Sequence, residues 1–196
     1  NRAAGVGSVA MGFNNIAGGT SGVGPFNDIV GENVGQAVFG WGSRATGTVS
    51  FASGKRNTAS GSQSVAMGNF NYATGDSSIS IGKENWAEGA SNVAIGYRNH
   101  SAGNGSVALG QENVAWGTTN FTAGYQNTAG DVNSAVGTGG SATAMGKYTT
   151  ASADSSMALN RGTSATNQAA TSMGFRTISN NLGMLAIGVN NDASIG

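Results

Sequence analysis

Residues 62–75 read SQSVAMGNFNYATG, and residues 76–89 read DSSISIGKENWAEG directly after them. The two stretches share a template of fourteen residues, in which small and apolar residues alternate from the third to the sixth position and glycine occupies the seventh and fourteenth. The template continues without a gap through units that start at Ala90 and Asn104. A fixed period of this kind is the signature of a repeat protein, in which each unit stacks on its neighbours.

The repeat extends over nearly the whole chain, and a single repeat domain is expected over residues 1–196, with about fourteen coils. Further units start at Val6, Thr20, Val34, Thr48, Thr118, Asp131, Gly140, Asp154, Gln168 and Leu182. The segment 20–33 lacks the motif, with Pro25 where an apolar residue would fall, and is expected to be a loop or an atypical rung. The segment 131–139 is short of the period and is expected to be a truncated rung.

The two glycines of each unit predict two corners, where a positive φ or the close approach of neighbouring coils excludes a Cβ atom. Between the corners the apolar residues alternate with period two, which indicates strands rather than helices. Strands of about five residues cannot bury themselves alone, so they must stack on copies of themselves at a spacing of about 4.8 Å. The sequence therefore predicts an all-β fold, a parallel β-solenoid.

Asparagine occupies the tenth position of many units and is expected to form a ladder of stacked amides that satisfies polar groups at a corner. The members of this set are Asn15, Asn57, Asn71, Asn85, Asn99, Asn113 and Asn127. Later units depart from the template, because Asn160 replaces the seventh glycine and Ala153, Asn167 and Asn181 replace the fourteenth. Asparagine tolerates a positive φ, so corners with asparagine are expected to survive.

Small and large residues occupy opposite faces of the first strand. A coil of fourteen residues has a thin interior, which favours residues such as Ala66 and Ala94 over larger ones. The large residues are then expected to form an apolar stripe on the outside and an interface between copies of the chain. The predicted interface residues are Val65, Met67, Ile79, Ile81, Val93, Ile95, Val107 and Leu109. In the alternative arrangement the large residues point inward and a monomer is self-sufficient.

Composition disfavours several classes of partner. Charged residues make up 9% of the chain and the formal net charge is zero, so no nucleic acid or anionic membrane is expected as a partner, and no partner is expected to be recruited by charge. No apolar run approaches the roughly 20 residues that span a bilayer, so direct membrane insertion by this sequence is not expected. The absence of cysteine removes disulfides and thiolate chemistry.

Catalytic residues are sparse, and no enzymatic activity, cofactor or metal is predicted. His100 is the only histidine, and it occupies a position that carries turn residues in neighbouring units. The acidic residues are scattered at turn positions, and Glu84 and Glu112 share the ninth position of their units without forming a motif. A glycan-processing enzyme is therefore the least favoured of the functions considered.

Four pentapeptides carry a resemblance to a known family. They are SVAMG at 8–12 and at 64–68, NVAIG at 92–96 and SVALG at 106–110, each followed by glycine seven residues later. They resemble the repeat of the YadA-like head of trimeric autotransporter adhesins. The resemblance implies a left-handed parallel β-roll, a homotrimer, and a place on the bacterial cell surface, anchored in the outer membrane through other regions.

Aromatic residues and arginine, which are enriched at recognition hot spots, recur in the second halves of the units. The candidate ligand-binding residues are Phe70, Tyr72, Trp86, Tyr97, Arg98 and Tyr125, and related residues elsewhere are Trp41, Arg56, Tyr148, Phe175 and Arg176. They predict binding of a host extracellular-matrix protein or a cell-surface receptor or glycan. Alternatively, the rings cover turn backbone or pack between protomers, and the chain is a structural fibre or spacer, including a phage-type tail fibre.

Overall fold

The computed structural model of the protein describes residues 1–3, 6–17, 34–131 and 140–192. The chain divides into two compact units, Asn1–Tyr97 and Arg98–Gly196. Within the described residues every helix or strand element is a β-strand, which confirms the prediction of an all-β protein. Among these residues there is also no helix of the length and apolarity that crossing a membrane requires.

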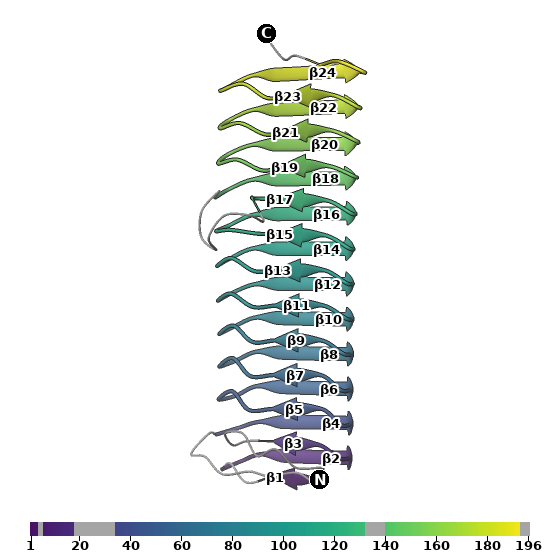
Figure 1. Cartoon of the computed structure of the whole chain (residues 1–196). Helices are drawn as coiled ribbons and strands as arrows, with labels where there is room; N and C mark the ends of the chain where they lie inside the picture. Colours follow the sequence, from purple (N-terminus) through teal and green to yellow (C-terminus); the bar gives the residue numbers. More distant parts are fainter. Residues whose placement is uncertain (4–5, 18–33, 132–139, 193–196) are drawn as a thin grey trace. The chain divides into compact units, whose positions relative to one another are not determined.

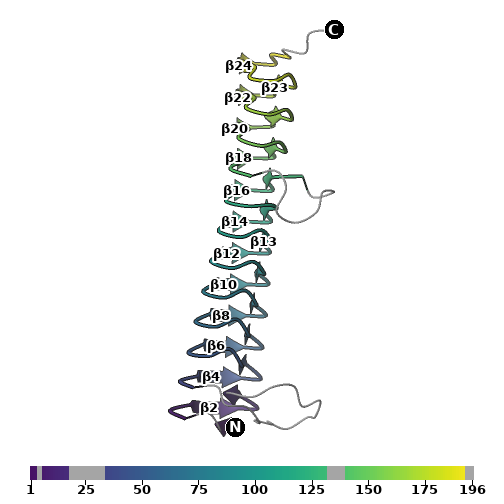
Figure 2. The same ribbon diagram turned by 90° about the vertical axis from the view of Figure 1, so that its left-hand side faces the viewer.

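Each fourteen-residue repeat forms one coil, which contains one strand of five residues and one of two residues (Figure 1). In the coil that starts at Ser62, the long strand is β8 (Val65–Asn69) and the short strand is β9 (Tyr72–Ala73). Figure 2 shows that, within each of the two compact units, the chain passes alternately through a long and a short strand. The long strands pair only with long strands and the short strands with short strands, so each unit has two parallel sheets.

In the first unit the long strands are β2 (Val9–Phe13), β4 (Ala37–Trp41), β6 (Phe51–Lys55), β8, β10 (Ile79–Lys83) and β12 (Val93–Tyr97). Its short strands are β1 (Arg2–Ala3), β3 (Ile16–Ala17), β5 (Arg44–Ala45), β7 (Thr58–Ala59), β9 and β11 (Trp86–Ala87).

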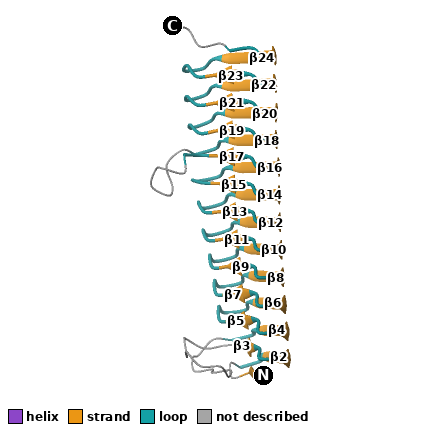
Figure 3. Cartoon of the chain, turned by 45° about the vertical axis from the view of Figure 1, so that its right-hand side comes forward, coloured by secondary structure: helices purple, strands orange, loops and turns teal. Residues whose placement is uncertain are grey.

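In the second unit the long strands are β14 (Val107–Gln111), β16 (Phe121–Tyr125), β18 (Thr143–Lys147), β20 (Met157–Arg161), β22 (Thr171–Phe175) and β24 (Leu185–Val189). Its short strands are β13 (His100–Ser101), β15 (Val114–Ala115), β17 (Thr128–Ala129), β19 (Thr150–Ala151), β21 (Ser164–Ala165) and β23 (Ile178–Ser179). Figure 3 shows the loops that connect successive strands.

The register places equivalent residues of neighbouring coils side by side. Ile79 of β10 pairs with Val93 of β12, and Gly82 pairs with Gly96, each fourteen residues further along the chain. The parallel solenoid with a fourteen-residue repeat is therefore confirmed.

Two places depart from this spacing. Val9 of β2 pairs with Ala37 of β4, and Phe121 of β16 pairs with Thr143 of β18, so both pairs of strands are direct neighbours. The segments 20–33 and 131–139, for which an atypical and a truncated rung were predicted, lie outside the described residues except for Asp131. Neither ladder contains a strand between these partners. The described residues contain twelve long strands, six in each unit, so the expectation of about fourteen coils is wrong.

Alanine fills the interior of the coils. Alanines at the fifth position, such as Ala66 and Ala94, and at the twelfth, such as Ala73 and Ala87, have no exposed surface. Among the described residues, the largest apolar side chain that is fully buried is Val38. The prediction that small residues face inward is confirmed, and the alternative with the large residues inside is wrong.

The two glycine corners are tight for different reasons. At the seventh position the backbone has a positive φ, 116° at Gly68, and a Cβ there would lie 2.0 Å from the carbonyl oxygen of Gly82 in the next coil. At the fourteenth position φ is not positive at Gly61, yet a Cβ would lie 2.0 Å from the carbonyl oxygen of Gly75. Close packing of neighbouring backbones alone therefore requires glycine at position 61, whereas Gly117, the fourteenth residue of its own unit, also has a positive φ of 111°.

The substituted corners follow the same distinction. Asn160 has a φ of 91°, so the prediction that asparagine keeps this corner is confirmed. Asn167 and Asn181 do not have a positive φ, so tolerance of that conformation is the wrong explanation at the fourteenth position. At Ala153, the third substituted corner at this position, the hydrogen bonding changes. The N–H of Ala153 donates to the Ser156 hydroxyl at 3.2 Å. The N–H of Gly61, by contrast, donates to the carbonyl of the next coil.

Asparagine at the tenth position forms the predicted ladder. The side-chain amide of Asn71 donates to the carbonyl oxygens of Met67 at 2.8 Å and Gly82 at 2.7 Å. Its side-chain oxygen accepts hydrogen bonds from the backbone N–H of Asn85 at 3.1 Å and from the Asn85 amide at 3.0 Å. Each asparagine therefore satisfies backbone groups of its own coil and of the next, which is the structural role expected for it.

Two further positions adopt a left-handed backbone that the sequence did not reveal. At the second and ninth positions non-glycine residues have φ near 55°, for example 57° at Gln63, 57° at Phe70 and 53° at Arg56. This conformation costs roughly 1–2 kcal/mol for a residue with a Cβ atom. At the ninth position it turns the chain sharply directly after the long strand.

The glycine corners give a direct test. Replacing Gly68 by alanine should destabilise the protein by at least about 3 kcal/mol, since the positive φ and the collision with the Gly82 carbonyl add together. Gly42→Ala is the matched control, because Gly42 also has a positive φ of 63° but its nearest neighbour would lie at 3.5 Å. The control should lose about 1–2 kcal/mol. Chemical unfolding followed by circular dichroism at a fixed protein concentration measures both, and equal losses would contradict this account.

Candidate functional site

Each coil presents three outward surfaces. The outer face consists of the fourth and sixth positions on the long strand, the corner consists of the eighth and ninth positions after it, and the eleventh position lies on the short strand. Because strands alternate the direction of their side chains, the buried residue at the fifth position fixes the fourth and sixth on the outside. The residues that were predicted to function fall on these three surfaces.

The outer face carries all eight predicted interface residues. Val65, Ile79, Ile81 and Val93 of the first unit are partly buried, as are Val107 and Leu109 of the second. Met67 and Ile95 retain 38% and 37% of their exposure. Cα pairing aligns Val65, Ile79 and Val93 on adjacent strands, so they form a continuous apolar stripe in the first unit.

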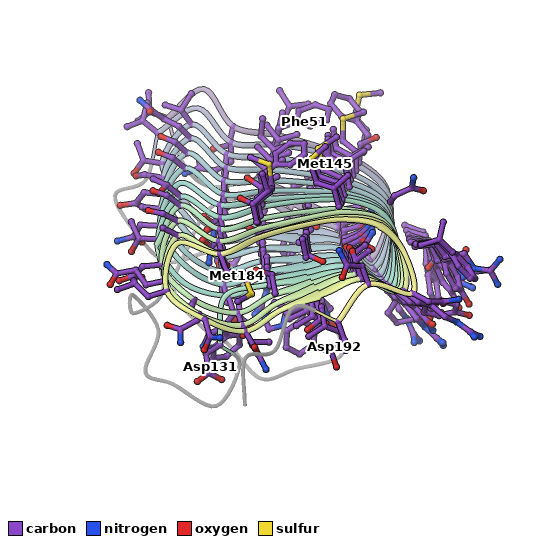
Figure 4. All side chains as sticks on the ribbon, turned by 90° about the horizontal axis from the view of Figure 1, so that it is seen from above. Phe51, Asp131, Met145, Met184 and Asp192 are labelled. Atoms are coloured by element: carbon purple, nitrogen blue, oxygen red, sulfur yellow. The ribbon has the colours of Figure 1, made fainter. Side chains whose placement is uncertain are left out.

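Aromatic rings extend the outer face in the earlier coils, which sequence reasoning did not anticipate. Phe39 and Phe51 lie with ring centroids 5.9 Å apart on β4 and β6. Figure 4 shows Phe51 in the first unit and Met145 in the second pointing outward from their ribbons. The signal was present in the template, because Phe51 occupies the fourth position and Phe39 the sixth.

The short strands bring two of the candidate binding residues together. Tyr72 and Trp86 lie on β9 and β11 with ring centroids 5.3 Å apart and an edge-to-face angle of 60°. In the second unit His100 and Trp116 make a similar contact at 5.6 Å. His100 lies on strand β13 and is partly buried against this ring, so it is not the turn residue that its position in the template suggested.

The corner of the first unit pairs rings with cations. The guanidinium of Arg56 lies 4.8 Å from the centre of the Trp41 ring and 5.3 Å from that of Phe70. The ammonium of Lys83 lies 5.1 Å from the centre of the Tyr97 ring. Phe70 and Tyr97 therefore contact basic residues, and each is partly buried.

The corner of the second unit has the denser arrangement. Lys147 lies 5.1 Å from the Tyr125 ring and 5.0 Å from the Tyr148 ring, and these two rings are 5.5 Å apart. Arg161 and Arg176 both lie over Phe175, at 5.5 and 5.2 Å. Tyr125 is thus part of a group of rings and cations. The candidate Arg98 is not part of this group and stands at the ninth position of an earlier coil.

Charge is distributed unevenly around the coil, although the chain is neutral overall. Seven of the nine basic residues occupy the eighth or ninth position: Lys55, Arg56, Lys83, Arg98, Lys147, Arg161 and Arg176. Asp76 and Asp154 lie at the first position, where they accept backbone hydrogen bonds from Ser62 and Gly140. The expectation that charge recruits no partner rested on the net charge and did not consider this segregation. The periodic template carried the signal, because the lysines directly follow the seventh residue of their units and most of the arginines at the corner stand one residue later.

Tyr125 does not offset the positive charge of the corner. Partial burial, the neighbouring Tyr148 and the carboxylate of Glu112 raise the pKa of Tyr125 above its ordinary value of 10.0. Its phenol therefore stays neutral at physiological pH. Of the two acidic residues at the ninth position, Glu84 lies 3.4 Å from the ammonium of Lys83, and Glu112 accepts a hydrogen bond from Gln126.

Within the residues that the structure describes, no three histidine, cysteine or acidic side chains gather in a way that could hold a metal ion. The arrangement of the site instead consists of apolar stripes, ring pairs and ring–cation pairs. Such surfaces bind or pack, since they position apolar area and charge rather than a nucleophile and a base.

The fold defines a class of protein. The chain is a parallel β-solenoid in which the large side chains of each coil point outward. The sequence model of the "YadA head domain repeat (2 copies)" matches residues 45–71, 73–99, 87–113 and 138–159. The chain therefore contains a YadA-like head domain, as the resemblance of its pentapeptides indicated. A comparison with curated proteins gave no significant match.

The ring pair on the short strands can be tested by a double-mutant cycle. Tyr72→Leu and Trp86→Leu should each destabilise the protein, and together they should show a coupling of about 0.5–1.5 kcal/mol, the range found for edge-to-face pairs. Chemical unfolding of the four proteins at one concentration measures the coupling. Additive losses would show that the two rings do not stabilise each other.

Proposed function

We propose that this chain is the head segment of a trimeric adhesin on a bacterial cell surface, and that it attaches to host extracellular-matrix protein or to a cell-surface receptor or glycan without catalysis. The YadA-like head repeats support this function. The observation that carries the proposal is the outward direction of the large aliphatic residues. Anchoring in the outer membrane would depend on regions outside these 196 residues.

The outer face supports self-association. A contiguous apolar stripe over adjacent strands is unusual on a monomer and is typical of an interface. Val65, Ile79 and Val93 form such a stripe, and Met67 and Ile95 beside it keep more than a third of their exposure. Three copies that cover these stripes with one another would bury them, and the resemblance to the YadA-like head favours three.

The corner and the short strands support attachment. Phe70 and Tyr97 at the corner combine apolar area with nearby cations, and Tyr72 and Trp86 on β9 and β11 form a pair of rings. Such residues dominate the binding energy of many protein interfaces. The repeat presents them on several coils, so a partner could contact more than one of them at the same time.

A structural fibre or spacer, including a phage-type tail fibre, is the second candidate. It is favoured by the contacts that the rings already make within the chain, such as Tyr72 with Trp86 and Phe70 with Arg56. Rings held in this way also stabilise successive coils without any external ligand.

Attachment of the purified chain to immobilised collagen, fibronectin and laminin distinguishes the two candidates. The variant F70A/Y72A/W86A/Y97A should bind at least tenfold less than the wild type, because it loses the ring surface. Q63A/S91A is the matched control on the exposed second position and should bind normally. A spacer would show no specific binding, and unchanged binding of the fourfold variant would also contradict the proposal.

The assembly is checked in the same experiment by the mass of the particle in solution. The wild type should have the mass of three chains, and Ile81→Asp should not, because it places a charge in the outer stripe. A wild-type mass of one chain would contradict the trimer. Loss of attachment by Ile81→Asp with a retained trimer would show that the outer face itself binds the ligand.

A further inference from the structure

The corner of the second unit concentrates positive charge on three adjacent coils. Lys147 and Arg161 are Cα partners on β18 and β20, and Arg161 pairs in turn with Phe175 of β22, which Arg176 follows. Adjacent strands of a sheet lie about 4.8 Å apart, so Lys147 and Arg161 are one such step apart, and Arg176 adds a cation from the next coil, one residue beyond the paired position. All three side chains are exposed.

These cations have no acidic partner in the described part of the chain. No ion pair there includes Lys147, Arg161 or Arg176, and the acidic Asp154 of the same coils accepts a backbone hydrogen bond at the first position. Unit charges about 4 Å apart in water interact by about 1 kcal/mol, so like charges at this spacing repel one another. An anionic ligand would relieve that repulsion, which makes the corner favourable for negative charge.

The rings hold the cations in place. Lys147 lies against both Tyr125 and Tyr148, and Phe175 lies under both guanidinium groups. Cation–π contacts of this kind restrict long side chains that would otherwise lose rotamer freedom on binding. The corner is therefore organised for an anion before the ligand arrives.

We propose that the corner formed by Lys147, Arg161 and Arg176 with Tyr125, Tyr148 and Phe175 binds a linear anionic polysaccharide with sulfate or carboxylate groups. The inference rests on the proposed function and gives the chemistry of the ligand at this part of the surface. Cations that recur at the pitch of the ladder suit a polymer whose charges also repeat. Guanidinium groups, moreover, form paired hydrogen bonds with planar and tetrahedral oxyanions.

The ring contacts favour a polysaccharide over a nucleic acid. Proteins that bind single-stranded nucleic acids stack bases on the free faces of aromatic rings. Here the cations lie over the faces of Tyr125, Tyr148 and Phe175, so the rings support charge rather than offer a stacking surface.

The test uses the whole chain in its native oligomeric state with immobilised heparin as the anionic probe and neutral dextran as the uncharged probe. Heparin should bind in a salt-dependent manner and dextran should not. The variants R161Q and R176Q should each weaken heparin binding at least threefold, and R161Q/R176Q at least tenfold. Arg44→Gln, which removes the same charge from short strand β5, should leave heparin binding within twofold of the wild type.

Two further variants separate charge from folding. R161K/R176K keeps the charge and should retain more binding than R161Q/R176Q, while Phe175→Leu should weaken binding because it frees both guanidinium groups. Each variant should keep the circular dichroism spectrum and solution mass of the wild type. A glutamine variant that loses either is replaced by the alanine variant at the same position, which removes the same charge and for which the same loss of heparin binding is expected.

Three results would overturn the inference: no binding of heparin, equal loss with Arg44→Gln and the corner variants, or equally tight binding of double-stranded DNA. Attachment to host cells before and after enzymatic removal of their sulfated glycans separates this inference from the proposed function. Unchanged attachment after removal would refute the polysaccharide ligand and leave the adhesin intact. Loss of attachment would support both.

Discussion

The interior of each coil accommodates one layer of alanine, serine and asparagine side chains, and this narrow space determines where every larger residue lies. Ala66 and Ala73 meet inside one coil, and Val38 is the largest apolar residue among the described ones that is fully buried. A buried methyl group contributes only about 0.8 kcal/mol, whereas ordering the backbone of one residue costs roughly 1–2 kcal/mol. The coil therefore depends on its ladder hydrogen bonds and on contacts outside itself. The aliphatic residues of the outer face are only partly buried within the chain. Full burial would stabilise the fold by about 1.5–3 kcal/mol for each of them, which is the largest further contribution available.

The same constraint fixes the display of the polar surface. Asn71 forms one hydrogen bond with Met67 of its own coil and three with Gly82 and Asn85 of the next, so the corner that follows the long strand is repeated with little variation. Residues at the eighth and ninth positions then recur at the pitch of the sheet. Any residue type that the sequence repeats at these positions therefore forms a line of equivalent side chains. In this chain the line consists of aromatic rings and cations. A repeat fold thus converts the choice of one residue per coil into a regular binding surface, and a neutral chain can present a basic corner.

Periodicity was sufficient to predict the strands, the inward alanines and the asparagine ladder, because each follows from the alternation of side chains or from a group that must be satisfied in every coil. It did not reveal the left-handed backbone at Phe70 and Arg56, since the ninth position carries glycine in only a few units, such as Gly42 and Gly162, and no common residue type in the others. It also gave the wrong reason for Asn167, because a glycine column looks the same whether φ or packing requires it. The sequence also could not predict which cations contact which rings. Lys147 contacts Tyr125 because β16 and β18 are direct neighbours, although these two residues are not one fourteen-residue period apart in the chain.

The measurement that bears most directly on the narrow interior is the stability of two leucine variants at neighbouring positions of β12, Ala94→Leu and Ile95→Leu. Ala94 has no exposed surface, so the larger side chain should force the two sheets apart and lower the free energy of unfolding by about 3 kcal/mol or prevent folding. Ile95 lies on the outer face, and its replacement should cost less than about 1.5 kcal/mol. Chemical unfolding at a fixed protein concentration compares them. If Ala94→Leu is tolerated as well as Ile95→Leu, the interior is wider than this account requires, and the reason for placing the aliphatic residues outside is lost.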